Sequence, residues 1–186
     1  MTRGLNFHKD AQTPTQMFTD SNWGGDQKCL STAGWVMMIS GAAVGWACKK
    51  QRSVSISSTE AELYAASLAT SVLIWFRRLL SDIGEDVAEP SVLREDNEGA
   101  IVLAEDPSQS TRARHIAIRE QFVYQYVQRK QVKLVWVKSN DNLADMFTKI
   151  QSKKNALSYI AMVTMLMGEW VTHVHIQVAS WYSYCS

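Results

Sequence analysis

Three short runs of mostly apolar residues lie near the start of the chain, and glycine-containing turns separate them. The run Thr15–Thr19 leads to Asp20, and the glycine pair Gly24-Gly25 then predicts a turn. Residues 32–39 and 44–48 form the next two runs, with a Ser-Gly-Ala turn signal after the first of them. The pattern predicts an antiparallel meander of three strands, with Asp20 at the end of the first strand.

The strongest helical pattern follows the third strand. Ser57 is a good N-cap, and Glu60 three residues later completes a capping box. Apolar residues then recur at three- and four-residue steps until Gly84, and they are Leu63, Ala66, Ala69, Leu73, Phe76 and Leu80. We therefore predict a long helix with one face on the core.

The second half of the chain alternates shorter elements. The pattern predicts a strand over 90–95, a helix over 97–104, a helical segment over 110–130, a strand over 131–137 and a closing helix over 141–149. Together with the meander, these elements predict an α/β fold with a five-stranded mixed sheet flanked by helices. A strand–helix–strand crossover allows the first and fourth strands to lie parallel.

Four carboxylates fall at notable places on this layout. Asp20 and Asp96 end the first and fourth strands, and these ends share one edge of the sheet if the strands are parallel neighbours. Glu62 lies in the first turns of the long helix, and Asp145 lies in the closing helix. Carboxylates that converge without basic partners imply a divalent cation, and oxygen ligands favour Mg²⁺ or Mn²⁺ over zinc. Two such ions can activate water and stabilise the leaving oxygen of a phosphodiester.

Each carboxylate also has an ordinary structural interpretation, and periodicity alone leaves the choice open. An aspartate at the end of a strand is a common turn former. Glu62 competes with its neighbour Glu60, although Glu60 already has a role in the capping box. Asp145 can be an early helix acid favoured by the helix dipole.

Composition narrows the picture without selecting a function. The 186 residues carry a net charge of +1, so a polyanionic partner would have to be bound by local clusters. A hydrophobic content of 46% excludes general disorder. The three cysteines (Cys29, Cys48 and Cys185) lack metal-type spacing and fit a reducing compartment. Residues 1–10 hold no apolar signal core, and 155–168 fall short of a membrane span, so we expect no membrane partner.

A family resemblance emerges at the blocks that contain these carboxylates. In chain order the blocks are Thr19-Asp20-Ser21-Asn22-Trp23-Gly24-Gly25, Ser31-Thr32-Ala33-Gly34-Trp35, Trp46-Ala47-Cys48-Lys49-Lys50-Gln51, Ser57-Ser58-Thr59-Glu60-Ala61-Glu62, Asp96-Asn97 and Ala144-Asp145-Met146-Phe147-Thr148-Lys149. Together they resemble the ribonuclease H domain of copia-type LTR retrotransposon polyproteins. The resemblance implies a ribonuclease H-like fold and metal-dependent hydrolysis of the RNA strand of an RNA/DNA hybrid. It also implies a neighbouring reverse transcriptase domain in the parent polyprotein.

Carried over residue by residue, the four acidic positions of that family fall on Asp20, Glu62, Asp96 and Asp145, which would hold two Mg²⁺ or Mn²⁺ ions. No small-molecule cofactor is implied. The chain departs from the family pattern at Asn22, Glu95, Ala117, the pair Glu120-Gln121 and Ile150. These departures keep a second hypothesis open, in which the chain is a catalytically inactive module that binds nucleic acid or a partner protein.

Other polar residues are candidate contacts to nucleic acid. Ser21 and Asn22 could contact a ribose hydroxyl, which distinguishes RNA from DNA. The remaining candidates are Lys49, Lys50, Asn97, Arg112, Arg114 and His115. The basic ones would bind backbone phosphate, although a basic turn or a solvated helix start would look the same. We expect four tryptophans in the core rather than stacked on bases, and they are Trp23, Trp35, Trp46 and Trp75.

The organisation expected along the chain has three parts. Residues 1–14 would be a lead-in from an upstream reverse transcriptase region, residues 15–150 the ribonuclease H-like domain, and residues 151–186 a C-terminal helix and tail. A retrotransposon protein of this kind is expected in the cytoplasm, in virus-like particles, or in the nucleus.

Overall fold

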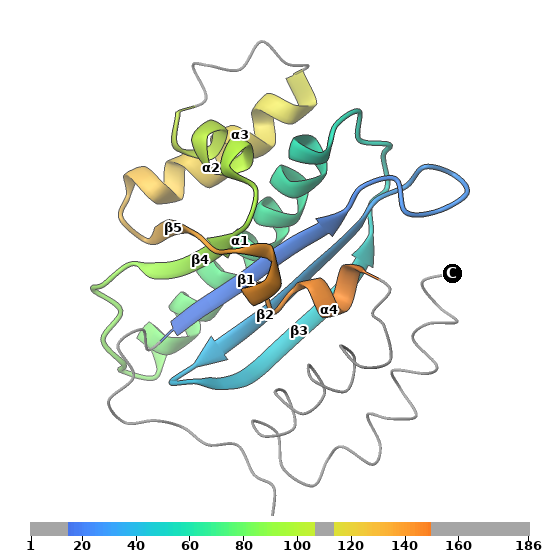
Figure 1. The fold of residues 1–186 in the computed structure, drawn as a ribbon. Helices are drawn as coiled ribbons and strands as arrows, with labels where there is room; N and C mark the ends of the chain where they lie inside the picture. The colour runs from blue at the N-terminus through green and yellow to red at the C-terminus, as the bar shows by residue number, and fades with distance from the viewer. Residues whose placement is uncertain (1–14, 107–113, 150–186) are drawn as a thin grey trace, which may run out of the picture.

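The computed structural model describes residues 15–106 and 114–149 (Figure 1). Its centre is one sheet of five strands in the order β3-β2-β1-β4-β5. The strands are β1 (Thr15–Asn22), β2 (Thr32–Ile39), β3 (Ala42–Lys50), β4 (Ser91–Glu95) and β5 (Val132–Trp136). The first three pair antiparallel, whereas β1 with β4 and β4 with β5 pair parallel. The predicted mixed sheet is confirmed.

The long helix α1 (Ser58–Asp82) covers one face of the sheet and lies behind β1 in Figure 1. Its N-terminus is capped as predicted, because Ser57 Oγ accepts the Glu60 N–H at 3.2 Å. The Glu60 side chain returns one residue further than in a standard capping box and accepts the Ile56 N–H at 2.8 Å. By length and composition α1 could cross a membrane, and half of its apolar window is buried in the domain, as in a core helix.

Two further helices, a 3₁₀ turn and a one-turn helix follow α1 in the described residues. Helices α2 (Glu98–Glu105) and α3 (Arg114–Gln128) pack beside α1. The predicted closing helix is shorter than expected, because the chain forms the 3₁₀ turn η2 (Ser139–Asp141) and then the one-turn helix α4 (Asp145–Thr148). Between them the Asn142 side chain is turned inward and donates to the Thr19 carbonyl at 2.9 Å, which interrupts the helix.

Two apolar cores lie on opposite faces of the sheet, as strand alternation requires. On the α1 face, Met17 and Met37 pack with Leu63 and Leu73 of the helix. On the other face, the next residue of β1, Phe18, packs with a cluster that includes Leu143 and Ala144. Figure 1 shows α4 in front of β1 and β2, on the face opposite α1. Side chains of β1 therefore reach α1 or α4 according to their position in the alternation.

Two sequence-based expectations need correction. The strand β1 continues through Asn22, so Asp20 lies inside the strand, where it pairs with Gly34 of β2. The expectation that all four tryptophans are buried is also wrong, because Trp23 is 53% exposed and Trp75 is 60% exposed. Trp75 lies on the outer face of α1, and Trp23 lies in the turn after β1, where its Nε1 donates to the Ser55 carbonyl at 2.8 Å.

The rest of the predicted organisation lies outside the described residues. This applies to the lead-in over residues 1–14, to residues 110–113 of the predicted helical segment, and to the helix and tail over 151–186.

Candidate metal centre

Asp20 is the central residue of the site, and the alternation of β1 fixes its direction. It follows Phe18 by two residues, so its side chain lies on the α4 face of the sheet. The residue is fully buried. One carboxylate oxygen, Oδ2, accepts a hydrogen bond from the Thr148 hydroxyl, and Oδ1 accepts one from Lys149 Nζ at 3.1 Å. Asp20 is thereby held in one position by the end of α4.

Glu62 and Asp96 approach Asp20 from two other elements. Glu62 lies in the first turns of α1, and Asp96 directly follows β4, the parallel neighbour of β1. One carboxylate oxygen from each of the three residues lies within 4.8 Å of the other two. The indole of Trp136 holds the Asp96 backbone, since its Nε1 donates to the Asp96 carbonyl at 3.1 Å. Strand β1, helix α1 and the end of β4 thus bring three of the four predicted carboxylates together.

Glu62 is in an environment that opposes its negative charge. It is 6% exposed, and its Oε2 atom is buried without a hydrogen-bond partner among the described residues. Burial raises the pKa of Glu62 well above its usual value, and the charges of Glu95, Asp20 and Asp96 raise it further. In the part of the chain that the structure describes, no salt bridge reaches Glu62 or Asp96. An added cation would relieve this repulsion.

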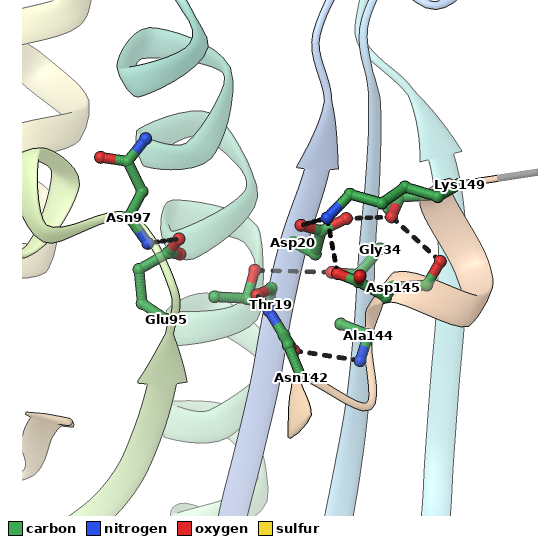
Figure 2. Close-up of polar contacts among 10 residues, drawn as sticks. Thr19, Asp20, Gly34, Glu95, Asn97, Asn142, Ala144, Asp145 and Lys149 are labelled. Carbon is green, nitrogen blue, oxygen red and sulfur yellow. Dashed lines mark hydrogen bonds and ion pairs between the residues drawn. The ribbon is translucent and has the colours of Figure 1, made fainter. Parts of the chain in front are cut away.

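Glu95 adds a further buried carboxylate beside the cluster. It is 1% exposed at the end of β4, where its Oε1 accepts the Asn97 N–H at 3.2 Å (Figure 2). Burial raises its pKa well above the usual value, and the charges of Asp96 and Asp20 contribute. The sequence signalled this residue only as a departure from the family pattern. Its electrostatic effect on Glu62 could not be predicted without the fold.

The fourth predicted carboxylate, Asp145, reaches the cluster through a lysine. Lys149 Nζ lies 2.7 Å from Asp145 Oδ1 and 3.1 Å from Asp20 Oδ1, so it bridges the two residues (Figure 2). Burial and the charge of Asp20 raise the pKa of Asp145 to about 6, although the Lys149 hydrogen bond opposes the rise. Burial alone would lower the pKa of Lys149, but the two carboxylates outweigh it and raise that pKa.

Two residues let α4 approach Asp20 closely, and sequence reasoning assigned neither of them this role. Gly34 of β2 lies under α4, where an added Cβ would stand 2.7 Å from Thr148 Cγ2 and 2.9 Å from Phe147 Cβ. Asn142 is fully buried and ties the preceding loop to β1. A glycine inside a predicted strand signals close backbone approach. For the ion pair between Asp145 and Lys149, the sequence signal is their i, i+4 spacing, which is typical of ion pairs on a helix.

The residues predicted to contact nucleic acid differ in how far their side chains are exposed to solvent. Lys49 is exposed, and Asn22 is half-buried beside Gly25. Ser21 is buried, and its hydroxyl accepts a hydrogen bond from Gln51 Nε2 at 3.3 Å, while Lys50 pairs with Asp26 at 2.7 Å.

The other candidates are a helix cap and three residues whose side chains the structure does not describe. Asn97 caps α2, because its Oδ1 accepts the Ala100 N–H at 3.1 Å. Arg112 and the side chains of Arg114 and His115 lie outside the described residues.

The donor set fits a hard divalent cation. Asp20, Glu62 and Asp96 offer carboxylate oxygens only, with no histidine or cysteine in the cluster. Such oxygen sets suit Mg²⁺ or Mn²⁺. Buried carboxylate oxygens normally have a partner, and Glu62 Oε2 has none among the described residues, so this atom is available to bind a cation. The residues present therefore match the ion type expected from the sequence.

Comparison with known proteins places the chain within longer polyproteins. It is 33% identical over 151 residues, 81% of its length, to the retrovirus-related Pol polyproteins from transposons RE2 and RE1 of Arabidopsis thaliana. It is also 33% identical over 134 residues to the Pol polyprotein from transposon TNT 1-94 of Nicotiana tabacum. The chain spans about a tenth of the length of these relatives, with 10% coverage of each. No protein-family model matches the chain.

Solved structures share the fold at low sequence identity. LC11-RNase H1 in complex with an RNA/DNA hybrid aligns with a TM-score of 0.50 at 15% identity, over 77% of this chain and 99% of that one. The foamy viral protease-reverse transcriptase in complex with an RNA/DNA hybrid aligns with a TM-score of 0.53 at 10% identity, over 78% of this chain and 21% of that one. The chain is therefore a homologue of a segment of retrovirus-related Pol polyproteins from transposons, and it has the ribonuclease H-like fold.

Proposed function

We propose that the chain is a metal-dependent endonuclease that hydrolyses the RNA strand of RNA/DNA hybrids as part of a copia-type retrotransposon polyprotein. The observation that carries the proposal is the convergence of Asp20, Glu62 and Asp96, whose carboxylate oxygens lie within 4.8 Å of one another on three different elements. Like charges at this spacing, with Glu62 buried, repel one another, and a cation held as a common partner would relieve that repulsion.

Each carboxylate has a proposed role in holding Mg²⁺ or Mn²⁺. Asp20, Glu62 and Asp96 would hold one ion, and Asp145 with Asp20 would hold a second. Bound divalent ions supply the activation of water and the neutralisation of a leaving oxygen in phosphodiester hydrolysis. The chain's own contribution is rigidity, since the sheet, the Thr148 hydrogen bond and the Trp136 hydrogen bond fix the ligands beforehand.

Two lines of support point to a hybrid substrate. The structures of LC11-RNase H1 and of the foamy viral protease-reverse transcriptase are both complexes with an RNA/DNA hybrid. The relatives are Pol polyproteins, in which a reverse transcriptase domain would produce such a hybrid beside this domain. Within the chain, the exposed Lys49 is a candidate for phosphate contacts and the half-buried Asn22 for ribose contacts. An intracellular location follows from this proposed role.

Cleavage of a labelled RNA/DNA hybrid tests the proposal, with Mg²⁺, Mn²⁺ or EDTA and with duplex DNA as a second substrate. We expect metal-dependent cutting of the RNA strand alone. Asp96→Asn should reduce the rate at least 100-fold, because even the loss of an outer partner of a metal ligand lowers activity about 10- to 100-fold. Asp82→Asn is the matched control. It lies at the opposite end of the 25-residue helix α1 from Glu62, roughly 30 Å away.

The alternative function has a distinct result in the same experiment. A folded protein that binds the hybrid and leaves it uncut with either metal ion would contradict the endonuclease proposal. That result would favour a binding module, in line with the buried Glu95 at a position where the family pattern has a small residue.

A further inference from the structure

Lys149 places a positive charge between two proposed metal ligands. Its Nζ atom contacts Asp20 Oδ1 at 3.1 Å and Asp145 Oδ1 at 2.7 Å. Figure 2 shows the lysine side chain extending over Asp20 from the end of α4. A cation shared by Asp20 and Asp145 would need oxygen atoms of the same two carboxylates.

We propose that Lys149 is an internal counter-ion that competes with a divalent cation for Asp20 and Asp145, and so sets the metal affinity of this half of the site. The inference rests on the proposed metal binding. It assigns a new role to a residue outside the set of four carboxylates. In this role Lys149 contacts neither the substrate nor the ion, and it acts through the two carboxylates that bind the ion.

The lysine can leave the site without disturbing the ligands. Its side chain is 40% exposed, so its ammonium group can turn into solvent. Lysine is a compact charge on a flexible stem, which suits a partner that must be displaced. Meanwhile the Thr148 hydroxyl still holds Asp20, and Asn142 still anchors the loop that leads to Asp145. Displacement of Lys149 would expose two carboxylates that remain in place.

The opposite role for Lys149 predicts the opposite result. If the lysine were needed to hold Asp145 in position, its removal would loosen a ligand and weaken metal binding. If it competes, its removal takes one counter-ion from both carboxylates and strengthens metal binding. The sign of the change in metal affinity therefore decides between the two roles.

Isothermal titration of Mn²⁺ into the metal-free full chain measures this sign. We expect Lys149→Met to bind Mn²⁺ roughly two- to fivefold more tightly than the unaltered protein, the range for loss of a partly exposed ion pair. Lys149→Arg should stay near the unaltered value because it keeps the charge. Lys50→Met is the matched control, since it removes the same charge from a pair with Asp26. Equal or weaker binding by Lys149→Met would overturn the proposal.

A second measurement needs no folded Met variant. In the unaltered protein with ¹³Cε-labelled lysines, we expect the Lys149 signal, assigned with Lys149→Arg, to shift in parallel with Mg²⁺ saturation. The Lys50 signal should not move. A Lys149 signal that stays fixed while Mg²⁺ saturates the site would contradict displacement.

Hybrid cleavage by the same samples separates this inference from the proposed function. If the unaltered protein cuts the hybrid but Lys149→Met shows no gain in Mn²⁺ affinity, the endonuclease proposal stands and the competition is overturned. A folded protein that binds no Mn²⁺ would overturn both.

Discussion

The two sides of Asp20 handle negative charge in different ways. On the side of α1 and β4, Glu62 and Glu95 are buried, their pKa values are raised, and no salt bridge within the described residues reaches Glu62. On the side of α4, Asp145 has an ion pair with Lys149 four residues later. Asp20 belongs to both sides, because it contacts Lys149 and also lies within the three-carboxylate cluster.

This difference indicates where an external cation matters most. Like charges that are buried together destabilise a fold unless something neutralises them. The α4 side has its own neutralising group, whereas the α1 side depends on protonation or on a bound ion. Changes that act on one side alone should therefore have separable effects on stability and on metal affinity.

The largest effect is expected from Gly34→Ala, which acts through the position of α4. The new Cβ would lie 2.7 Å from Thr148 Cγ2 and 2.9 Å from Phe147 Cβ, so α4 must shift away from the sheet. Overpacking of this kind lowers the free energy of unfolding by about 1–3 kcal/mol. Urea denaturation measures this loss, and Mn²⁺ titration should show weakened binding at Asp145 with binding at Glu62 and Asp96 retained.

Gly45→Ala is the matched control for that substitution. The nearest atoms to its added Cβ are 3.6 Å away on Met37 and Trp35, an ordinary van der Waals separation. We expect the free energy of unfolding to stay the same or to rise slightly, because alanine restricts the unfolded chain. Equal free energies of unfolding for the two variants would show that the close contact between α4 and β2 does not contribute to stability.

The next largest effect is on the free energy of unfolding without metal, which Glu62→Gln and Lys149→Met should change in opposite directions. Glu62→Gln should raise the free energy of unfolding by about 1 kcal/mol, because it removes a buried like charge. Lys149→Met should lower it by about 1 kcal/mol or less, because Asp20 and Asp145 lose a partly exposed partner. Thermal or urea unfolding in EDTA measures both. Changes of the same sign would remove the distinction between the two sides.

Addition of Mg²⁺ should narrow the difference in stability between the unaltered protein and Glu62→Gln. The unaltered protein should gain stability in proportion to its metal affinity, whereas Glu62→Gln should gain less because a ligand is lost. The two proteins should therefore approach each other in stability as Mg²⁺ increases.

Regular patterns in the sequence predicted the fold well. The meander, the capped helix α1 and the parallel pairing of β1 with β4 all follow from alternation, cap residues and crossover rules. The boundaries were less accurate, because pairing with β2 carries β1 through Asp20 to Asn22. The closing helix was overestimated because a buried hydrogen bond from Asn142 to Thr19 interrupts it, and these residues are far apart in sequence.

The candidate site shows the same division between local and long-range information. The four carboxylates could be selected from their place on the elements and from the family resemblance. The bridging position of Lys149 and the burial of Glu95 depend on how α4 and β4 meet β1, which no local pattern encodes. Trp23 was expected in the core because it is a large aromatic residue, yet the turn after β1 leaves it 53% exposed.

The smallest expected effect is a pH dependence that isolates Asp145. Its pKa is raised from 3.8 to about 6, so the folded chain keeps a proton that the unfolded chain releases at lower pH. Between about pH 4 and pH 6 the folded state binds more protons, and its stability must fall as pH rises. The raised pKa values of Glu62 and Glu95 extend the decline to higher pH. Lys149 adds nothing here, because its raised pKa affects stability only in alkaline solution.

Asp145→Asn should remove the part of the decline between about pH 4 and pH 6, which we expect to be on the order of 1 kcal/mol. Urea unfolding in EDTA across this range measures the difference between variant and unaltered protein, and the difference cancels the histidines, which are the same in both. Asp82→Asn, on the exposed end of α1, should leave the slope unchanged. An unaltered protein that gains stability relative to Asp145→Asn as the pH rises would mean that Lys149 outweighs burial and Asp20. The α4 side would then be fully neutralised without metal, and the contrast with the α1 side would be larger than the raised pKa of Asp145 indicates.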